Sequence, residues 1–346
     1  MANDLRVGVI GVGMMGADHA ERVVNRVAGA RLVAVSDPDT ARADQLAAQF
    51  DGVRSIGDPL ALIADDEVDA VIIASPGFVH EEQVLACLEH GTYALCEKPL
   101  TMDSESSLRI VEAEHKAGRP LVQVGFMRRF DPEYAQLKAM LDSGTYGRTL
   151  LLHNTHRNKT VPDSFRSEMI VRDSLVHEVD VARFVFGEEI EEITVLAGTP
   201  TGEAAEGVLD PQVALFRMAG GGLVTSEVFV NCQVGYEVRC EVVAERGTIT
   251  AGKNSTGIFS TLADEQGGSW GGQVAPDFRV RFARAYDLEV QSWVDASRRG
   301  EVVGPTSWDG YAATAVCTAG MESLATGRPV KVDLADRDAV LGGVAR

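Results

Sequence analysis

Short apolar runs alternate with amphipathic segments along the first third of the chain. Such runs predict buried strands, and apolar positions every three to four residues predict helices. Regular alternation of the two predicts parallel strands joined by right-handed crossovers, which is a doubly wound sheet. The expected strands are Leu5–Ile10, Leu32–Val35, Ala70–Ala74, Tyr93–Cys96 and Leu121–Val124. The expected helices run from the glycines after Ile10 to Arg26, over about Thr40–Phe50, briefly after Asp58-Pro59, and over about Glu81–His90 and Ser104–Ala117.

From Gly125 onward strands follow one another, and Ala219–Gly222 predicts a hairpin turn between two of them. Hairpin-linked strands form antiparallel pairs. We therefore expect an α/β chain with two domains: residues 1–124 with the parallel sheet, and residues 125–346 as an α+β domain with a mostly antiparallel open sheet. The expected elements are strands Thr149–Thr155, Ile193–Leu196, Val213–Met218, Leu223–Val230 and Glu237–Val243, helices Pro132–Asp142, Met169–Phe186, Phe278–Ser297 and Asp309–Ala325, and an exposed loop Ser255–Ala275.

The composition narrows the class of protein. The 346 residues carry a formal net charge of −19, which disfavours nucleic acid and anionic membranes as partners because both need basic patches. We find no apolar run of the roughly 18 residues that a spanning helix needs. A strand that begins at Leu5 leaves no room for a signal peptide. The five cysteines form no C-x-x-C motif, so we expect reduced thiols in a cytoplasmic protein and no metal site.

A glycine fingerprint follows the first strand. Gly11-Val12-Gly13-Met14-Met15-Gly16 is a G-x-G-x-x-G motif between a strand and a helix. Its glycines permit the tight turn, the approach of a pyrophosphate and close helix packing, and phosphate binds at the helix N-terminus. Asp37 ends the second strand, where a ribose-binding acid is expected. The motif predicts a Rossmann domain that binds NAD; the alternative is three turn glycines and a helix-capping Asp37.

Lys98 comes directly after the strand Tyr93–Cys96. Ligands of doubly wound sheets bind beyond the carboxyl ends of the strands. A lysine there could polarise a substrate hydroxyl and stabilise its alkoxide-like state. The alternative is a surface lysine paired with Glu97.

The helix Met169–Phe186 carries a polar stripe. Asp173, His177 and Asp180 stand at positions i, i+4 and i+7, which share one face of a regular helix. An imidazole beside a carboxylate makes a general base with a fixed tautomer. The alternative is a surface stripe with Asp173 as a cap. Zinc is disfavoured because no fourth Cys or His is suitably spaced.

Two further clusters are dense in hydrogen-bonding groups. Gly125–Asp131, which contains Arg128, follows the last parallel strand, and His153–Asn158 ends a strand of the second domain. In a strand His156 and Asn158 face the same way. Donors and acceptors at this density suit a ligand with many hydroxyls.

Taken together, these motifs resemble the Gfo/Idh/MocA oxidoreductases, and within them the bacterial inositol 2-dehydrogenases. The matching motifs occur in the family's order and span nearly the whole chain. It rests on Gly11–Gly16, Glu97-Lys98-Pro99, Gly125–Arg129, His156-Arg157-Asn158, Asp173–Asp180, Asn231-Cys232 with Gly235-Tyr236, Ala285-Tyr286-Asp287, and Gly304-Pro305-Thr306 with Trp308–Tyr311.

The resemblance implies NAD-dependent oxidation of a secondary hydroxyl of myo-inositol, with Lys98, Asp173 and His177 as the catalytic set. It implies that the polyol contacts Arg128, His156, Asn158, Asp180 and Tyr236, and that the enzyme is a homotetramer. The expected cofactor-binding residues are Gly11, Gly13, Met14, Met15, Gly16, Asp37, Arg42, Ser75 and Glu97.

The chain departs from the family at three places. Gly77 stands where the superfamily often has Asn, and Ser164–Ser167 and Ser255–Ala275 follow no strong family pattern. These departures bear on the nicotinamide contacts and on specificity among cyclitols and sugars. The alternatives are the same chemistry on scyllo- or chiro-inositol, a pyranose or an anhydrosugar, a nucleotide-binding sensor without turnover, and a redox-neutral NAD-assisted enzyme.

Overall fold

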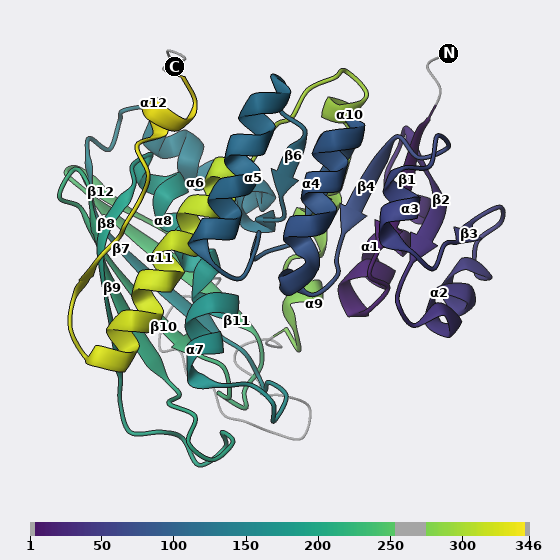
Figure 1. The fold of residues 1–346 in the computed structure, drawn as a ribbon. Helices are drawn as coiled ribbons and strands as arrows, with labels where there is room; N and C mark the ends of the chain where they lie inside the picture. Colours follow the sequence, from purple (N-terminus) through teal and green to yellow (C-terminus); the bar gives the residue numbers. More distant parts are fainter. Residues whose placement is uncertain (1–3, 253–274, 343–346) are drawn as a thin grey trace. The chain divides into compact units, whose positions relative to one another are not determined.

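The computed structural model describes residues 4–252 and 275–342. The chain forms two compact units (Figure 1). The first comprises residues 1–126, 286–314 and 335–346, and the second comprises residues 127–285 and 315–334. The chain thus returns twice to the first unit after leaving it, whereas the sequence predicted one boundary between residues 124 and 125. Hydrophobic periodicity follows neighbours along the chain, so it does not reveal a distant segment that packs back.

A six-stranded parallel sheet forms the centre of the first unit. Its strand order, β3-β2-β1-β4-β5-β6, places β1 next to β4, with the order reversing between them. The predicted α/β doubly wound sheet is confirmed. The two-residue strand β3 was not predicted, because it is too short to show a period. The strands are β1 Leu5–Ile10, β2 Ala30–Ser36, β3 Arg54–Ser55, β4 Ala70–Ile73, β5 Tyr93–Cys96 and β6 Val122–Val124.

Capping residues mark the ends of several helices of this unit. Asp58 and Asp103 accept hydrogen bonds from first-turn N–H groups, while Gly91 and Gly118 end their helices in the left-handed region. The helices are α1 Met14–Asn25, α2 Thr40–Ala47, α3 Pro59–Ile63, the 3₁₀ turn η1 Gly77–Val79, α4 His80–His90, α5 Ser104–Ala117 and α12 Arg337–Val340.

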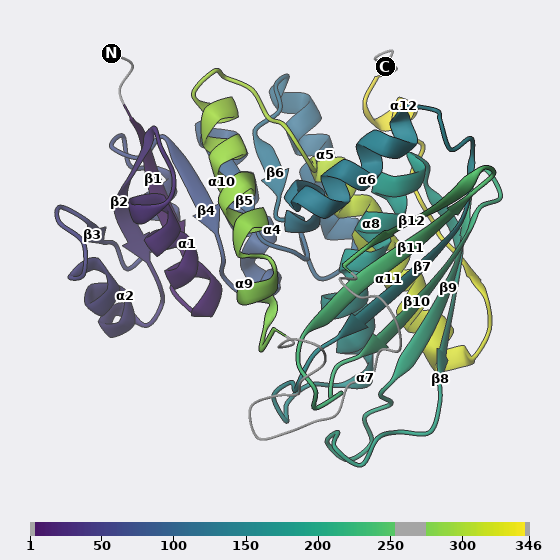
Figure 2. The ribbon, with the colours of Figure 1, turned by 180° about the vertical axis from the view of Figure 1, so that it is seen from behind.

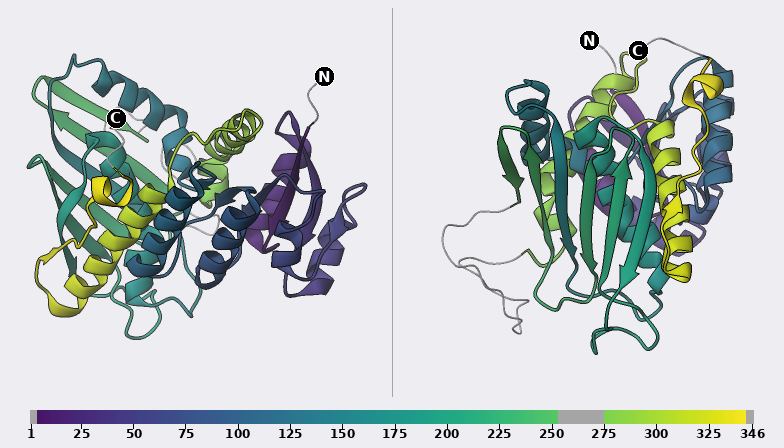
Figure 3. Two further views of the ribbon diagram at one scale, coloured as in Figure 1. Left: turned by 45° about the horizontal axis from the view of Figure 1, so that its top comes forward. Right: turned by 90° about the vertical axis from the view of Figure 1, so that its left-hand side faces the viewer.

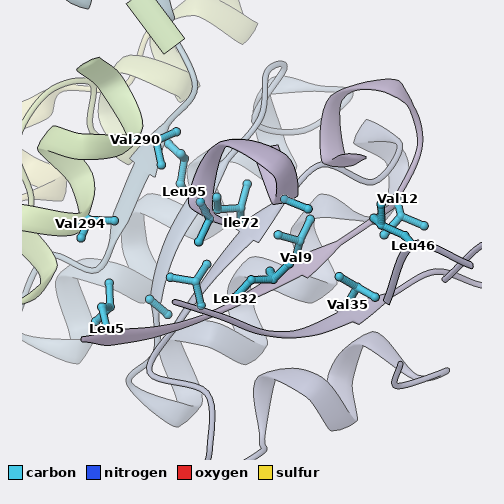
Figure 4. Packing of buried hydrophobic residues seen from close by; sticks show 14 of the residues in the cluster. Leu5, Val9, Val12, Leu32, Val35, Leu46, Ile72, Leu95, Val290 and Val294 are labelled. Carbon is cyan, nitrogen blue, oxygen red and sulfur yellow. The ribbon is translucent and has the colours of Figure 1, made fainter. Parts of the chain in front are cut away.

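The core of the first unit includes a late segment of the chain (Figure 4). Val290, Trp293 and Val294 of helix α10 (Ala283–Ser297) are buried in one cluster with strand residues such as Val9 and Ile72. Burying three large apolar side chains contributes several kcal/mol at roughly 1.5–3 kcal/mol each. The first unit is therefore incomplete without α10.

A seven-stranded sheet forms the second unit, in the order β12-β11-β7-β10-β9-β8-β13 (Figure 2). All neighbours are antiparallel except β7 and β10, which pair in parallel, so the predicted mostly antiparallel sheet is confirmed. The strands are β7 Thr149–Arg157, β8 Ile190–Ala197, β9 Gln212–Met218, β10 Leu223–Phe229, β11 Glu237–Ala244, β12 Gly247–Ala251 and β13 Val330–Lys331.

Helices of the second unit pack on one face of this sheet. The carboxyl-terminal half of α11 (Ser307–Thr326) lies against β8, where a Cβ at Gly320 would come within 2.9 Å of Ile193. Val195 N–H also donates to Ser323 Oγ at 2.9 Å. The remaining helices are α6 Pro132–Asp142, α7 Ser167–Met169, the π-helical turn η3 Ile170–Leu175, α8 Val176–Phe186 and α9 Phe278–Arg281.

The predicted helix Met169–Phe186 is not uniform. Its first part, Ile170–Leu175, is π-helical, with i→i+5 hydrogen bonds and a wider turn. The regular i, i+4 spacing that we assumed for Asp173 and His177 therefore does not apply across this segment. The predicted loop Ser255–Ala275 lies, except for Ala275, outside the described residues.

Figure 3 (right) shows the strands of the second sheet. The face of this sheet away from the helices exposes apolar side chains. Burial alternates strictly along β9, so that Val213 and Leu215 point to the exposed face. Leu196 and Leu223 on the neighbouring strands are exposed to a similar degree, between 43% and 48%. None of the helices in residues 4–252 and 275–342 is long and apolar enough to cross a membrane.

Candidate active site

The glycine loop between β1 and α1 has the geometry that phosphate binding requires. Gly11 has a φ of +82°, and a Cβ at Gly16 would clash with the Gly11 carbonyl oxygen. By contrast, a Cβ at Gly13 would meet no described atom within 4 Å, so the backbone there is open to a ligand. No described side chain caps the N-terminus of α1. The free N–H groups and the open backbone fit the pyrophosphate of a dinucleotide.

Asp37 is built into this loop. Its Oδ2 accepts a hydrogen bond from Val12 N–H at 2.9 Å, and its Oδ1 accepts one from Asp39 N–H at 2.9 Å. Arg42 lies beside it, with Nη1 3.8 Å from Asp37 Oδ2 and Nη2 3.2 Å from Asp39 Oδ2. The buried carboxylate is thus fixed beside the glycine loop, as the ribose-binding acid of a Rossmann domain is.

Glu97 and Lys98 follow β5. Glu97 is buried, and its Oε1 lies 2.9 Å from Nε2 of the buried His19. Burial acts to raise the pKa of Glu97, but the hydrogen bond with His19 and the positive charge of the neighbouring Lys98 outweigh it, so this pKa lies below its usual range. Lys98 is half-buried, and its backbone N–H donates to Glu97 Oε2 at 3.3 Å. Contacts of Glu97 and Lys98 with ligands stay predictions.

His80 connects the loops that follow β4 and β5. Its Nε2 lies 2.8 Å from the carbonyl oxygen of Ser75, and its Nδ1 lies 3.0 Å from that of Pro99. Burial lowers the pKa of this imidazole. The Ser75 hydroxyl donates to Gln83 Oε1 at 2.7 Å. These contacts fix the backbone at Ser75 and at Pro99, which directly follows the candidate ligand residues Glu97 and Lys98.

In the second unit, Asp173 lies in the π-helical turn and His177 in the first turn of α8. The Asp173 carboxylate accepts from Nε and Nη2 of Arg172 at 2.7 and 2.8 Å. His177 is buried, and its ring centroid lies 6.1 Å from that of His156 on β7. π-Helical turns inside α-helices are frequent at functional sites. The turn sets Asp173 and His177 at the end of α8 that faces the predicted substrate residue His156.

A buried charged cluster surrounds His156. Arg128 forms an ion pair with Glu178, and Glu178 Oε2 lies 3.0 Å from His156 Nδ1. Burial acts to raise the pKa of Glu178, but the charge of Arg128 and the hydrogen bonds with His156 and Arg128 outweigh it and lower this pKa. Tyr236 packs edge-on against His156, with ring centroids 5.6 Å apart. The tertiary fold therefore brings together three of the predicted substrate residues, from η2 (Met127–Phe130), β7 and the loop just before β11.

Tyr236 keeps its phenolic proton. Burial raises its pKa, and the nearby Arg128 only partly opposes this effect. A neutral phenol can donate a hydrogen bond to a ligand hydroxyl.

Asn158 and Asp180 differ in their surroundings. Asn158 N–H donates to the Phe229 carbonyl at 2.9 Å, and its buried Oδ1 has no hydrogen-bond partner within the described part of the chain. Asp180 is 1% exposed, and its carboxylate accepts from Nε and Nη2 of Arg129 at 2.6 to 3.1 Å. The Asn158 oxygen is thus placed to accept from a ligand. Asp180 belongs to an ion pair, and its contact with a polyol stays a prediction.

The residues of these networks that were not predicted from sequence include His19, His80, Arg129 and Glu178. One signal could have identified Glu178. The helix around it is apolar on nearly all sides, so its charged residues must be buried and paired. His19 carries a similar signal, three residues after Gly16 on the buried face of α1. Among residues 4–252 and 275–342, no three His, Cys, Asp or Glu side chains form a metal-binding group.

Two family models match the chain. Residues 5–126 match the oxidoreductase family with the NAD-binding Rossmann fold, and residues 134–250 match the GFO/IDH/MocA C-terminal domain. Between them they cover more than half of the chain. The predicted family, the oxidoreductase class and the NAD-binding domain are confirmed.

Several similar proteins match this chain along nearly its full length. Inositol 2-dehydrogenase of Mycolicibacterium smegmatis is 52% identical over 98% of this chain and 99% of its own. That of Rhodococcus jostii is 51% identical over 99% and 96%. The solved myo-inositol dehydrogenase of Lactobacillus casei, in complex with NAD(H) and myo-inositol, has a TM-score of 0.89 at 33% identity, covering 98% of this chain and 99% of that one. Matched in both its domains and over its whole length, this chain belongs to the Gfo/Idh/MocA family of NAD-dependent oxidoreductases.

Proposed function

We propose that this enzyme is an inositol 2-dehydrogenase, which oxidises one secondary hydroxyl of myo-inositol to the ketone with NAD. The observation that carries the proposal is the buried group of Arg128, His156 and Tyr236 beside His177. This group offers several donors and acceptors within a small, largely desolvated volume, which suits a neutral ring with many hydroxyls. Relatives about 52% identical over nearly the whole chain are named inositol 2-dehydrogenase, which supports the same substrate.

The proposed catalytic set is Lys98, Asp173 and His177. His177 takes the proton of the reacting hydroxyl as general base. The negative charge of Asp173 stabilises the imidazolium that results. The Lys98 ammonium stabilises the developing alkoxide. When bound to the glycine loop, NAD supplies a nicotinamide ring that accepts a hydride from carbon.

The remaining hydroxyls are recognised by hydrogen bonds. Tyr236 donates, and Asn158 Oδ1 accepts, because this buried oxygen has no partner among the described residues. Arg128 keeps its charge and lies in the same cluster. Such a site rejects analogues that lack a hydroxyl, since its buried polar groups would then be left unpaired.

Formation of NADH with a panel of cyclitols and sugars tests the proposal. We expect the highest kcat/KM with myo-inositol, and lower values with scyllo- and chiro-inositol, pyranoses and anhydrosugars. A higher kcat/KM with another polyol would mean that this polyol is the preferred substrate of the same oxidation. A solved scyllo-inositol dehydrogenase of Lactobacillus casei shares the fold, with a TM-score of 0.84 at 24% identity over 96% of this chain and all of that one, so fold alone does not choose between epimers. Absence of NADH with every polyol would contradict the proposal and favour a sensor or a redox-neutral enzyme.

We also propose that the enzyme is a cytoplasmic homotetramer. All five cysteines are free, in keeping with a reducing compartment. The exposed Val213, Leu215 and Leu223 on one sheet face form an apolar surface that a second copy would cover.

A further inference from the structure

Glu178 lies at the centre of the buried cluster in the second unit. Its side chain is fully buried, and its two oxygens serve different partners. Oε1 accepts a hydrogen bond from Arg128 Nη1. Oε2 lies 3.0 Å from His156 Nδ1. Glu178 therefore joins an arginine and a histidine that reach the cluster from η2 and β7.

The short distance between Glu178 and His156 determines which ring nitrogen carries the proton. A neutral imidazole has one N–H and one lone pair. If Nδ1 carried the lone pair, it would face a carboxylate oxygen at 3.0 Å, and two electron pairs would repel. Arg128 Nη2 could instead donate to that lone pair, but it lies farther away, at 3.3 Å. The arrangement favours a proton on Nδ1 and a lone pair on Nε2.

We propose that Glu178 is a positioning residue that keeps Nε2 of His156 as a hydrogen-bond acceptor. His156 can then accept a hydrogen bond from one ligand hydroxyl, whereas Tyr236 in the same cluster donates one. Glu178 thereby determines which side chains of the cluster donate hydrogen bonds to a polyol and which accept them. The hydrogen bond from a ligand hydroxyl to His156 rests on the proposed function. The position of the proton on the His156 ring does not.

The arrangement makes a specific prediction for Glu178→Gln. Arg128 has only donors, so it draws the amide oxygen of the new side chain toward itself. The amide NH₂ then faces His156 Nδ1, where it donates to a lone pair. The proton of His156 moves to Nε2, and the acceptor toward the ligand becomes a donor.

Nitrogen NMR of protein labelled with ¹⁵N-histidine, without ligand and near neutral pH, tests this directly. The chain has seven histidines, and the signal of His156 is the one that disappears in His156→Asn. We expect a protonated Nδ1 in the wild type and a protonated Nε2 in Glu178→Gln. An unprotonated Nδ1 in the wild type, or a proton on both ring nitrogens, would overturn the proposal, and this result does not depend on whether the variant folds.

Kinetics provide the second readout. In Glu178→Gln we expect KM for myo-inositol to rise about tenfold or more, with a smaller change in kcat, because one hydrogen bond is reversed while the base is retained. The matched control is Glu189→Gln, which neutralises a carboxylate that accepts from Arg183 at 2.6 and 2.8 Å after the other end of α8. The control should leave the His156 tautomer and KM unchanged. An unchanged tautomer in a folded Glu178→Gln would contradict the proposal. If no cyclitol is oxidised and the tautomer still inverts, the proposed function fails and the positioning role stands.

Discussion

The carboxylate of Asp37, at the end of β2, accepts a hydrogen bond from the backbone N–H of Val12 at 2.9 Å. One oxygen of the expected ribose-binding acid is therefore used to hold the glycine loop. Asp39 N–H binds the other oxygen at 2.9 Å. Both bonds fix the direction of the carboxylate beside the glycine loop, where the ribose is expected.

We predict that the enzyme prefers NAD to NADP. A fixed carboxylate can accept from the ribose 2′-hydroxyl and repels a 2′-phosphate. The replacement Asp37→Ser should reduce the ratio of kcat/KM for NAD to that for NADP by about tenfold or more, since a tenfold change corresponds to about 1.4 kcal/mol. Arg42, 3.8 Å from Asp37, is then available to a phosphate. A clear NADP preference in the wild type would contradict this role of Asp37.

Alanine substitutions at two glycines of the loop should impair the enzyme for different reasons. Gly13→Ala should fold normally, because its Cβ meets no described atom within 4 Å, but NAD should bind at least tenfold more weakly because the methyl group occupies the path of the pyrophosphate. Gly16→Ala should lower Tm, because its Cβ clashes with the Gly11 carbonyl. Thermal unfolding and NAD titration by calorimetry separate the two. Equal NAD affinity in Gly13→Ala and wild type would show that the cofactor does not approach there.

Removal of the proposed base should reduce turnover without unfolding the protein. His177→Ala should lower kcat by roughly 10²–10⁴-fold, which is typical for a general base. Asp173→Asn and Lys98→Met should lower kcat as well, through a less stable imidazolium and a less stable alkoxide. NAD affinity should change little in His177→Ala, because the glycine loop and Asp37 belong to the first unit and His177 to the second.

The pH profile of kcat/KM checks the same assignment. In the wild type, oxidation should rise with pH as the His177 imidazole loses its proton and can accept one from substrate. This rise should be absent in His177→Ala. Wild-type turnover in the variant would make His177 a structural residue.

The exposed sheet face should hold the tetramer together. Leu215→Glu should shift the mass measured by light scattering toward smaller species, because a charge on this face prevents burial of the neighbouring Val213 and Leu223. Val24→Glu on α1 is the matched control, since Val24 is exposed to the same degree, 42%, in the first unit. A monomeric wild type at working concentration would refute the assembly.

Stability should depend on pH through Asp69. Its carboxylate accepts from Nε and Nη2 of Arg6 at 2.9 and 2.6 Å, and the Arg6 hydrogen bond holds the pKa of Asp69 below its usual range. A carboxyl with a lowered folded-state pKa stabilises the fold above its unfolded-state pKa, near 3.8, and this stabilisation is lost as the pH falls through the folded-state value.

Measurements of Tm between neutral pH and about pH 3 test this. The Tm of Asp69→Asn should be lower than that of the wild type at neutral pH by roughly 2 °C, because the pair is partly exposed and worth about 1 kcal/mol or less. The difference should disappear in acid. Asp66→Asn, at an exposed neighbour in the same loop, should follow the wild-type curve. A constant difference at all pH values would mean that the Asp69 charge is not responsible.

The elements that depend on local chemistry could be predicted from the amino-acid sequence. Strand β1, the glycine loop and helix α6 have the predicted positions, because apolar period, glycine conformation and proline or aspartate capping act within a few residues. The parallel, doubly wound sheet followed from the alternation of strands and helices, whereas the order of its strands was not predicted. Gly13, Asp37 and Lys98 could be proposed as ligand residues from sequence because each stands at or just after the end of a predicted strand.

The partners of the buried charges and the limits of the two units depend on long-range packing, which no local pattern in the sequence records. Glu178 is next to His177 in sequence, but its role comes from Arg128 and His156, which are 50 and 22 residues away. The π-helical turn before α8 and the return of Val290 and Trp293 to the first core were likewise unpredictable. The physical reason is that periodicity records which face of an element is buried. The identity of the group that meets that face depends on long-range packing, and a buried charge is stable only where packing supplies its partner.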